Sequence, residues 1–276
     1  LADKLRGNYA ASVLVDNRPG AAGGIGIMAT RDSPADGSVM MIAPTSPLAV
    51  SPSTFAKLPY DPLSDVAPVS LACTFDHGIG VGPLVPPGVK TLRDFLHWAR
   101  ANPAQAAYGS PAAGSVPHLI VSLLAQHGNA PLRHIAYRGS APGIQDLLGG
   151  QIAAMASPVG DYLPYLKSGR LRLLAISGPK RSPFAPDTPT VRESGYPITA
   201  REWYGLFMPG KTPPDILRRA SAYLQIALSH ADLAGAMAQM GLEVQHSTPQ
   251  ALAEMLRKET QDWRQAVKAV NFTAES

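Results

Sequence analysis

The sequence NRPGAAGGIG occupies residues 17–26, and KLPYDP occupies residues 57–62. Between the two blocks lie the turn pair Asp36-Gly37 and a short apolar run at 39–43. Glycine and proline at this density indicate tight turns and close packing of helices. Neither block holds a nucleophile, a metal-binding cluster or an acid–base pair, so we expect both to be scaffold.

The composition of the chain is that of a folded globular protein. It has 276 residues, of which 45% are hydrophobic and 16% are charged. This length allows one large domain or two domains of moderate size, each with its own core. The 27 prolines recur in short loops, which indicates many rigid connections in place of one flexible linker.

Charge and cysteine content exclude several classes of protein. The net charge is +4, but the basic residues are scattered and form no clustered footprint for nucleic acid. The single cysteine, Cys73, excludes an intramolecular disulfide and a cysteine-rich zinc site. No apolar stretch approaches the ~20 residues that a membrane-spanning helix needs. The opening LADKLRGN resembles the last turns of a helix closed by Gly7, so we expect a first strand and an export signal to precede it.

Strands and helices alternate along most of the chain, which predicts an α/β fold. Strands are expected at 12–15, 39–43, 66–75, 78–83, 106–109, 132–136, 152–156, 171–177 and 204–208. Helices are expected at 24–31, 92–101, 115–126, 162–167 and in the C-terminal segment, with another that Ser140 caps. Thr91 and Asp94 form a predicted capping box. Repeated βα units between about 79 and 202 favour a mostly parallel sheet covered by helices.

The element order predicts two α/β lobes, the second inserted into the first. Lobe one is expected to comprise residues 1–78 and 203–276, and lobe two residues 79–202. The crossover segments would then lie near 77–80 and 200–203. A cleft between two such lobes is a usual place for a small ligand, and hinge closure operates there.

Three enzymatic or cofactor-binding interpretations find little support. Gly24, Gly26 and Ala29 satisfy a relaxed dinucleotide spacing, but residues 16–20 separate them from their strand and no acidic residue ends the next strand. Ser115 with His118 is a conceivable nucleophile and base for a hydrolase, without the G-x-S-x-G elbow. The histidines lack metal-ligand spacing. No cofactor and no metal are therefore expected.

Small polar residues follow three of the expected strands. They lie at Pro44-Thr45-Ser46, at 109–115 and at Ser157-Pro158. Helix N-terminal amides at such turns hold anions without a cationic side chain. Hydroxyl groups that merely cap helices are the alternative for any single turn, but the three together favour capture of a carboxylate.

The chain resembles the Bug-type periplasmic solute receptors of the tripartite tricarboxylate transporters. The two opening blocks carry the resemblance, and so do YRGSAP at 137–142, DLLGGQ at 146–151, KRSPFAPDTPTVRESGYP at 180–197 and EWYG at 202–205. Each motif is of modest specificity. Their order and spacing over the whole chain are specific.

The resemblance implies a two-lobed periplasmic binding-protein fold, type II-like, that closes on a small organic acid in the interlobe cleft. It also implies a non-catalytic, periplasmic receptor that delivers its ligand to membrane permease subunits, with a monomer as the default state. A receptor-like sensory module shares this fold and is the other alternative to the hydrolase. By position, the resemblance assigns these ligand-binding residues: Thr45, Ser46, Ser110, Ala113, Gly114, Ser115, His118, Ser157, Pro158 and Trp203. Core packing is an equal alternative for the Trp203 ring.

The sequence departs from the family pattern at two places. The first strand of the family and its proline-glycine anion loop do not occur in it. Many relatives carry an aspartate where this chain has Ser157, which favours a plain carboxylate or an aromatic acid over a ligand with an ammonium group.

Overall fold

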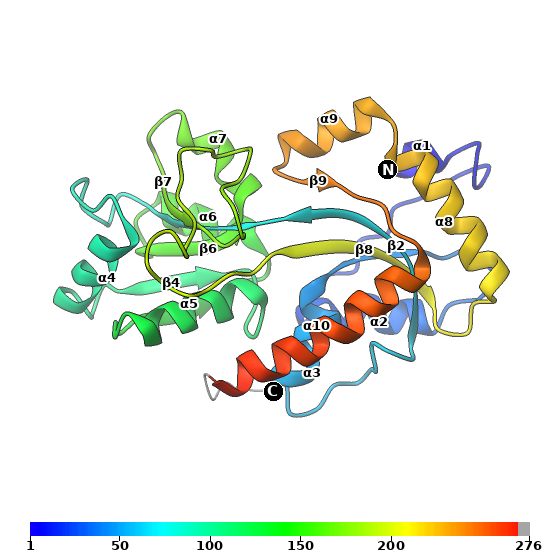
Figure 1. Ribbon diagram of the computed structural model, residues 1–276, viewed down its shortest axis with the longest axis horizontal. Helices are drawn as coiled ribbons and strands as arrows, with labels where there is room; N and C mark the ends of the chain where they lie inside the picture. Colours follow the sequence, from blue (N-terminus) through cyan, green and yellow to red (C-terminus); the bar gives the residue numbers. More distant parts are fainter. Residues whose placement is uncertain (270–276) are drawn as a thin grey trace. The chain divides into compact units, whose positions relative to one another are not determined.

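The chain folds as two compact units, and the computed structural model describes residues 1–269 of it. Unit 1 contains Leu1–Thr74 and the segment from Trp203 onward, and unit 2 contains Phe75–Glu202. Unit 2 is therefore one continuous segment inserted into unit 1. In Figure 1 unit 1 combines the blue and the yellow-to-red parts of the chain, and unit 2 is cyan to green.

Unit 1 is built on a four-stranded sheet with the order β1-β8-β2-β9. Its strands are β1 (Met41–Pro44), β2 (Val66–Phe75), β8 (Glu202–Pro209) and β9 (Glu243–Val244). β1 pairs antiparallel with β8, and β9 pairs antiparallel with β2. Segments from the two ends of the sequence thus complete a single sheet.

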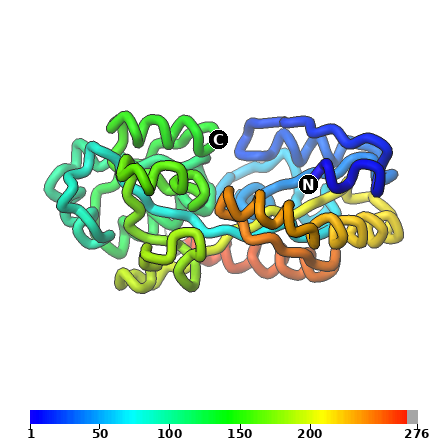
Figure 2. Tube along the Cα trace, turned by 90° about the horizontal axis from the view of Figure 1, so that it is seen from above, coloured from blue at the N-terminus to red at the C-terminus, as the bar shows by residue number. Residues whose placement is uncertain are grey.

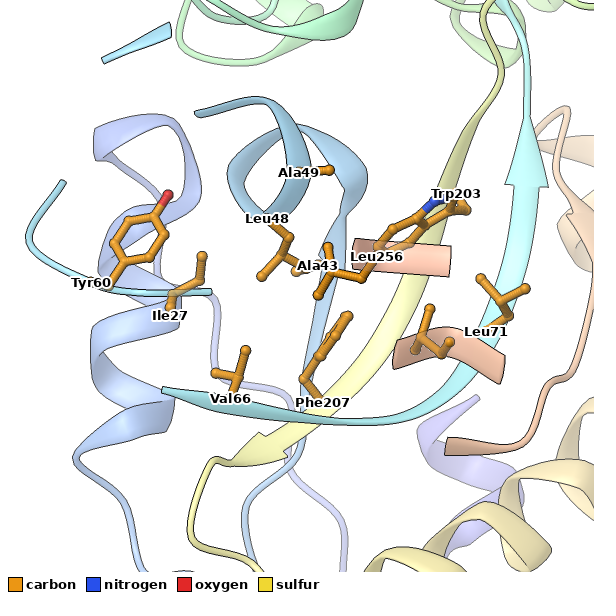
Figure 3. Close-up of a cluster of buried hydrophobic side chains, with 11 residues drawn as sticks. Ile27, Ala43, Leu48, Ala49, Tyr60, Val66, Leu71, Trp203, Phe207 and Leu256 are labelled. Atoms are coloured by element: carbon orange, nitrogen blue, oxygen red, sulfur yellow. The ribbon is translucent and has the colours of Figure 1, made fainter. Parts of the chain in front are cut away.

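Strand β8 contributes to a core on each face of this sheet because successive side chains of a strand point to opposite faces. Trp203 and Phe207 belong to one buried cluster, which Figure 3 shows with Ile27 and Leu256. Leu206 and Met208 of the same strand belong to a second cluster. A strand that is covered on both faces has a nearly continuous apolar sequence, and β8 has such a sequence.

Helices from both halves of the sequence cover the unit 1 sheet. They are α1 (Ala2–Leu5), α2 (Gly24–Arg31), α3 (Ser51–Thr54), α8 (Pro214–Leu228), α9 (Ala231–Gln239) and α10 (Pro249–Ala269), with η1 (Ala21–Gly23) and η2 (Ser46–Val50). The C-terminal α10 packs against η2 and α3, and α1 lies beside α8 (Figures 1 and 2).

The two sequence blocks that open the chain meet in unit 1. A Cβ atom on Gly24 would lie 3.0 Å from the ring of Tyr60, so glycine at this position lets helix α2 pack directly on KLPYDP. The Tyr60 hydroxyl donates a hydrogen bond to the carbonyl of Pro47 (2.8 Å). Both blocks are therefore scaffold, as predicted.

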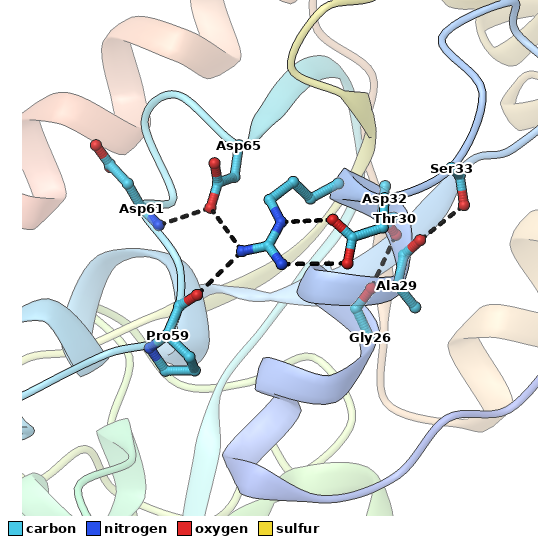
Figure 4. A network of polar contacts seen from close by, with 9 residues as sticks. Gly26, Ala29, Thr30, Asp32, Ser33, Pro59, Asp61 and Asp65 are labelled. Atoms are coloured by element: carbon cyan, nitrogen blue, oxygen red, sulfur yellow. Dashed lines mark hydrogen bonds and ion pairs between the residues drawn. The ribbon is translucent and has the colours of Figure 1, made fainter.

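Arg31 at the end of α2 links this helix to the second block and to the loop after it. Figure 4 shows its partners Asp32, Pro59 and Asp65. Its guanidinium donates to the carbonyl of Pro59 (3.0 Å) and to the carboxylate of Asp32 (2.8 Å). The Asp65 carboxylate lies 3.6 Å from the guanidinium. These contacts orient the loop that leads into β2.

Unit 2 is built on a five-stranded sheet with the order β5-β4-β6-β3-β7. Its strands are β3 (His77–Val81), β4 (Ala107–Ser110), β5 (Arg133–Ala136), β6 (Ala154–Pro158) and β7 (Arg172–Ile176). β4 pairs parallel with β5 and β6, whereas β3 pairs antiparallel with β6 and β7. Four strands of this sheet thus run in one direction, and the strand that brings the chain into unit 2 runs against them.

The helical segments of unit 2 connect these strands. They are α4 (Leu92–Ala101), α5 (Val116–His127), α6 (Ser140–Leu148), η3 (Val159–Asp161) and α7 (Leu163–Leu166). Tyr162, between η3 and α7, is fully buried and packs on strand β3. A Cβ atom on Gly80 would overlap its ring at 2.4 Å, and one on Gly78 would lie 3.1 Å from it, so the alternating glycines of β3 make room for the tyrosine.

A buried His77–Glu202 contact and a partly buried Arg201–Asp76 ion pair join the segments at which the chain enters and leaves unit 2. His77 Nε2 lies 2.7 Å from Glu202 Oε2, and Arg201 Nε lies 3.4 Å from Asp76 Oδ1. The Ser177 hydroxyl links the same segments, since it accepts from the His77 amide and donates to the carbonyl of Ala200. The two crossing segments are thus held together inside unit 2.

Several local predictions can be compared with the structure. The capping box of Thr91 and Asp94 is confirmed, with both reciprocal hydrogen bonds present. The strand at 12–15 was wrong, since no ladder forms there and Leu14 is 91% exposed. An alternating apolar pattern makes a strand only where a partner strand lies beside it. The prediction that Ser140 caps a helix was wrong, because the N-cap of α6 is Gly139, at φ 93°, and Ser140 is the first helical residue.

Candidate functional site

Polar and small residues gather at one edge of the unit 2 sheet. The carboxyl ends of β4, β5 and β6 meet at this edge because the three strands are parallel. Helices α5 and α6 and the turn η3 begin there. Of the predicted ligand-binding residues, seven belong to this edge: Ser110, Ala113, Gly114, Ser115, His118, Ser157 and Pro158. In open α/β sheets the carboxyl ends of parallel strands are where ligands bind.

The loop between β4 and α5 is ordered by its own hydroxyl groups. Ser110 Oγ and Ser115 Oγ both donate to the carbonyl of Ala112, at 3.0 and 2.7 Å. Gly114 adopts φ 68°, a left-handed conformation that suits glycine. Its amide donates to His118 Nδ1 (3.0 Å). The predicted residues of this loop are therefore brought together, and Ala113 is partly exposed at its centre.

His118 of α5 and His134 of β5 stack on one another beneath this loop. Their ring centroids lie 3.5 Å apart with an angle of 11° between the planes. Burial, and then the neighbouring His134, lower the pKa of His118 to about 3; burial lowers the pKa of His134 to about 4. His134 Nε2 lies 2.8 Å from Ser110 Oγ. Both imidazoles are neutral at pH 7, so any anion held here is held by dipoles and hydroxyl groups, without an imidazolium.

These bonds argue against a Ser115–His118 hydrolase. A nucleophilic serine must pass its proton to the base, but the single hydroxyl proton of Ser115 is directed to the carbonyl of Ala112. His118 Nδ1 already accepts a hydrogen bond from the Gly114 amide. The histidine thus positions the loop.

The segment after β6 places two further polar side chains at the same edge. Ser157 is fully buried, and its hydroxyl has no hydrogen-bond partner among the described residues. Pro158 pairs with His77 in the β3–β6 ladder and is partly exposed. One turn further, at the end of η3, stands Asp161, whose Oδ2 is buried and likewise without a partner among the described residues.

Asp161 was not predicted from the sequence. Burial raises the pKa of its carboxyl group, while the nearby hydroxyl groups of Ser140 and Ser157 and the charge of His77 act in the opposite direction. The i, i+4 spacing rule gives no signal for it, because Ser157 ends strand β6 and only Val159–Asp161 are helical.

The other three predicted residues belong to unit 1. Thr45 is fully buried at the end of β1, and its Oγ1 accepts from the Trp203 amide (3.1 Å) and donates to the Trp203 carbonyl (3.4 Å). Ser46 begins η2 and is partly exposed. The Trp203 indole is 2% exposed, lies in the core shown in Figure 3 and donates to Glu259 Oε2 (2.9 Å). Of the two roles considered for this ring, the structure supports core packing.

Neither a metal site nor a membrane-spanning helix occurs among residues 1–269. Within residues 1–269, no group of three or more His, Cys, Asp or Glu side chains is arranged to hold a metal ion. No helix of that part of the chain combines the length and the apolar character that crossing a membrane requires.

Comparison with known proteins identifies relatives over nearly the whole chain. The model of the tripartite tricarboxylate transporter family receptor matches residues 1–272. Protein BugT of Bordetella pertussis is 34% identical over 275 residues, which cover 97% of this chain and 82% of BugT.

Solved structures share the fold. Rpa4515 of R. palustris with adipate superimposes with a TM-score of 0.92 at 26% identity, covering 99% of this chain and 91% of that one. The periplasmic binding protein BugD gives a TM-score of 0.90 at 25% identity, with coverages of 99% and 92%. MatC from Rhodopseudomonas palustris with bound malate gives 0.86 at 25% identity, with coverages of 96% and 91%.

These neighbours are two-lobed periplasmic binding proteins, so the predicted fold class is confirmed. The family consists of solute-binding receptors and not of enzymes. From its sequence and its fold, this chain belongs to the Bug-type receptors of the tripartite tricarboxylate transporter family.

Proposed function

We propose that this protein captures a small organic acid in the periplasm and delivers it to the membrane permease subunits of a tripartite transporter. The family assignment supports a receptor outside the cytoplasm. Structural neighbours carry adipate and malate, which supports a carboxylate as the ligand class. Capture takes no cofactor and no catalytic step.

The observation that carries the proposal is the polar edge of the unit 2 sheet. Helices α5 and α6 begin there. The first backbone amides of a helix have no hydrogen-bond partner within the helix. The hydroxyl-bearing loops at 110–115 and 157–161 flank them. Such an edge binds a carboxylate through backbone amides, hydroxyl groups and water.

The site residues divide by role in this proposal. Ser110, Ala113, Gly114, Ser115, Ser157 and Pro158 of unit 2 are the candidate contacts, and Ser46 is the candidate from unit 1. His118, Thr45 and Trp203 act as positioning residues, because their described polar bonds hold the loops on which the contacts lie.

A thermal-shift screen of mono-, di- and tricarboxylates tests capture. Binding to the folded state at 100 times Kd adds about 2.7 kcal/mol to the free energy of unfolding, which is a shift of several degrees in Tm. If no acid in the screen changes Tm, capture of a carboxylate is contradicted.

Delivery is tested separately, by uptake of the radiolabelled acid into cells that carry the cognate permease. Uptake is expected only when the receptor gene is present. Uptake that is equal without the receptor assigns the protein to a sensory role. Light scattering with and without ligand tests the expected monomer.

A further inference from the structure

Three neighbouring polar side chains, those of Ser140, Ser157 and Asp161, form what we call the polar group. Binding of a simple carboxylate does not require it. Ser140 is the first residue of α6, Ser157 ends β6 and Asp161 ends η3. Their proximity follows from the fold, since α6 packs against both β6 and η3. The Ser140 and Ser157 hydroxyl groups lie close enough to Asp161 to affect its ionisation.

Hydrogen-bond donors are scarce in this group. An ionised carboxylate offers about four acceptor positions, and each serine hydroxyl supplies one proton. Ser157 Oγ is fully buried without a hydrogen-bond partner among the described residues, and so is Asp161 Oδ2. Buried polar atoms of this kind are nearly always satisfied in a working protein. The polar group is therefore suited to a ligand that carries a hydrogen-bond donor.

The neighbouring helix fixes where that donor lies on the ligand. The N-terminus of α6 attracts a carboxylate, and Ser140 belongs both to this N-terminus and to the polar group. A carboxylate held by the first amides of α6 therefore brings the carbon next to it close to Asp161. A substituent on that carbon is the part of the ligand that reaches the group.

We infer that Asp161, with the hydroxyl groups of Ser140 and Ser157, accepts a hydrogen bond from a hydroxyl or ammonium group next to a carboxylate of the ligand. The protein then selects 2-substituted acids over the unsubstituted ones. The inference rests on the proposed function and deepens it. It reverses the expectation that Ser157 favours a plain carboxylate, because the acidic group stands one turn further along the chain.

Burial of Asp161 is compatible with a carboxylate beside it. It raises the pKa of this carboxyl group, which reduces the repulsion that two full negative charges would cause. A neutral carboxyl group still accepts a hydrogen bond through its carbonyl oxygen. An ammonium substituent on the ligand favours the ionised form of Asp161, whereas a hydroxyl substituent can donate a hydrogen bond to either form.

The test uses three four-carbon dicarboxylates that differ only at C2: succinate, malate and aspartate. Calorimetric titration of the full chain is expected to give a Kd for malate or aspartate at least about tenfold below that for succinate, the effect of one hydrogen bond to an acidic group. In Asp161→Ala, which removes the acceptor altogether, the difference is expected to fall below about twofold. Asp187→Asn, an exposed aspartate of the same unit, is the matched control and should keep the wild-type preference.

A second variant keeps the inference testable if changes at Asp161 impair folding. Ser157→Ala removes the buried hydroxyl beside Asp161, and it should also reduce the preference. Equal Kd values for the three acids in the wild-type protein would overturn the inference, as would an equal loss for all three in Asp161→Ala. If the wild-type protein binds none of the three acids, nor adipate, the proposed function itself fails and the inference with it.

Discussion

At the scale of single residues, the stacked pair of His118 and His134 sets the chemical character of the β4–α5 loop. The backbone amide of Gly114 donates a hydrogen bond to His118 Nδ1. This nitrogen therefore cannot take up a proton without losing that hydrogen bond. Protonation of both rings would also place two positive charges at the 3.5 Å stacking distance. The pair is therefore a neutral support under the polar loop.

We expect this pair to make the protein less stable as the pH falls. The folded pKa values, about 3 and about 4, are below the ordinary value of 6.5, so the unfolded chain binds more protons below pH 6.5. The stabilising contribution is complete above pH 6.5 and is lost as the pH falls toward 4. Between pH 7 and pH 5 the loss should be about 1–2 kcal/mol in the free energy of unfolding, allowing for solvent screening.

Urea denaturation of the wild type and of His118→Gln at pH 7, 6 and 5 measures this effect. The variant should lose a substantial part of the dependence on pH. His127→Gln, an exposed histidine at the end of α5, should keep all of it. An unchanged dependence in His118→Gln would show that the pair is not its source.

Single residues also show which features of the candidate site could be predicted from the sequence and which could not. Ser110, Ser115 and Ser157 could be predicted as site residues because hydroxyl groups after strands often face an anion, and their role stays a prediction. Asp161 was missed because its significance depends on burial and on a helical turn that no sequence motif announces. For Trp203 the sequence allowed two roles, and only the packing of β8 decides between them.

At the scale of elements, strand β3 of unit 2 packs against the buried ring of Tyr162. Its glycines at 78 and 80 face the ring of Tyr162, whose hydroxyl donates to the carbonyls of Met155 (2.6 Å) and Gly78 (3.2 Å). The tyrosine thus joins β3 to β6 and fixes the segment from which Ser157 and Asp161 project. An accurate ligand site requires this rigid support.

Gly80→Ala is expected to destabilise the protein by about 1–3 kcal/mol, since the added methyl group would overlap the buried ring. Chemical denaturation provides the measurement. Gly88→Ala is the matched control, because a Cβ atom there meets nothing within 4 Å, and it should change stability by less than about 0.5 kcal/mol. Equal stability of the two variants would contradict the assigned packing.

Elements with a local code were predicted well, and those that depend on partners were not. The capping box of α4 is such a code, because Thr91 and Asp94 satisfy each other within one turn. The segment 12–15 has the alternation of a strand but no ladder among the described residues, since strand formation depends on neighbours distant in sequence. The direction of β3 also depends on where the chain enters the sheet.

At the scale of the whole molecule, the inserted order of the units means that the chain crosses between them twice. Both crossing segments are tied inside unit 2 by the pair of His77 and Glu202 and the pair of Asp76 and Arg201. The side chains of His77 and Glu202 are nearly fully buried. Removal of one partner leaves the other buried without compensation.

Glu202→Ala is therefore expected to lower the free energy of unfolding by about 2–4 kcal/mol. Thermal and urea unfolding at pH 7 give the measurement. Asp262→Ala, which removes an exposed pair with Lys258, is the comparison and should cost less than about 1 kcal/mol. If the two losses are equal, the buried pair does not hold the crossing segments.

The central claim is that this molecule captures a carboxylate and releases it unchanged, and calorimetric titration with adipate and malate, followed by analysis of the recovered acid, tests it most directly. The account predicts heat that saturates at one acid per chain for at least one of the two, and a recovered acid identical to the one added. Absence of binding for both acids, or continuing heat with a chemically altered product, would contradict it.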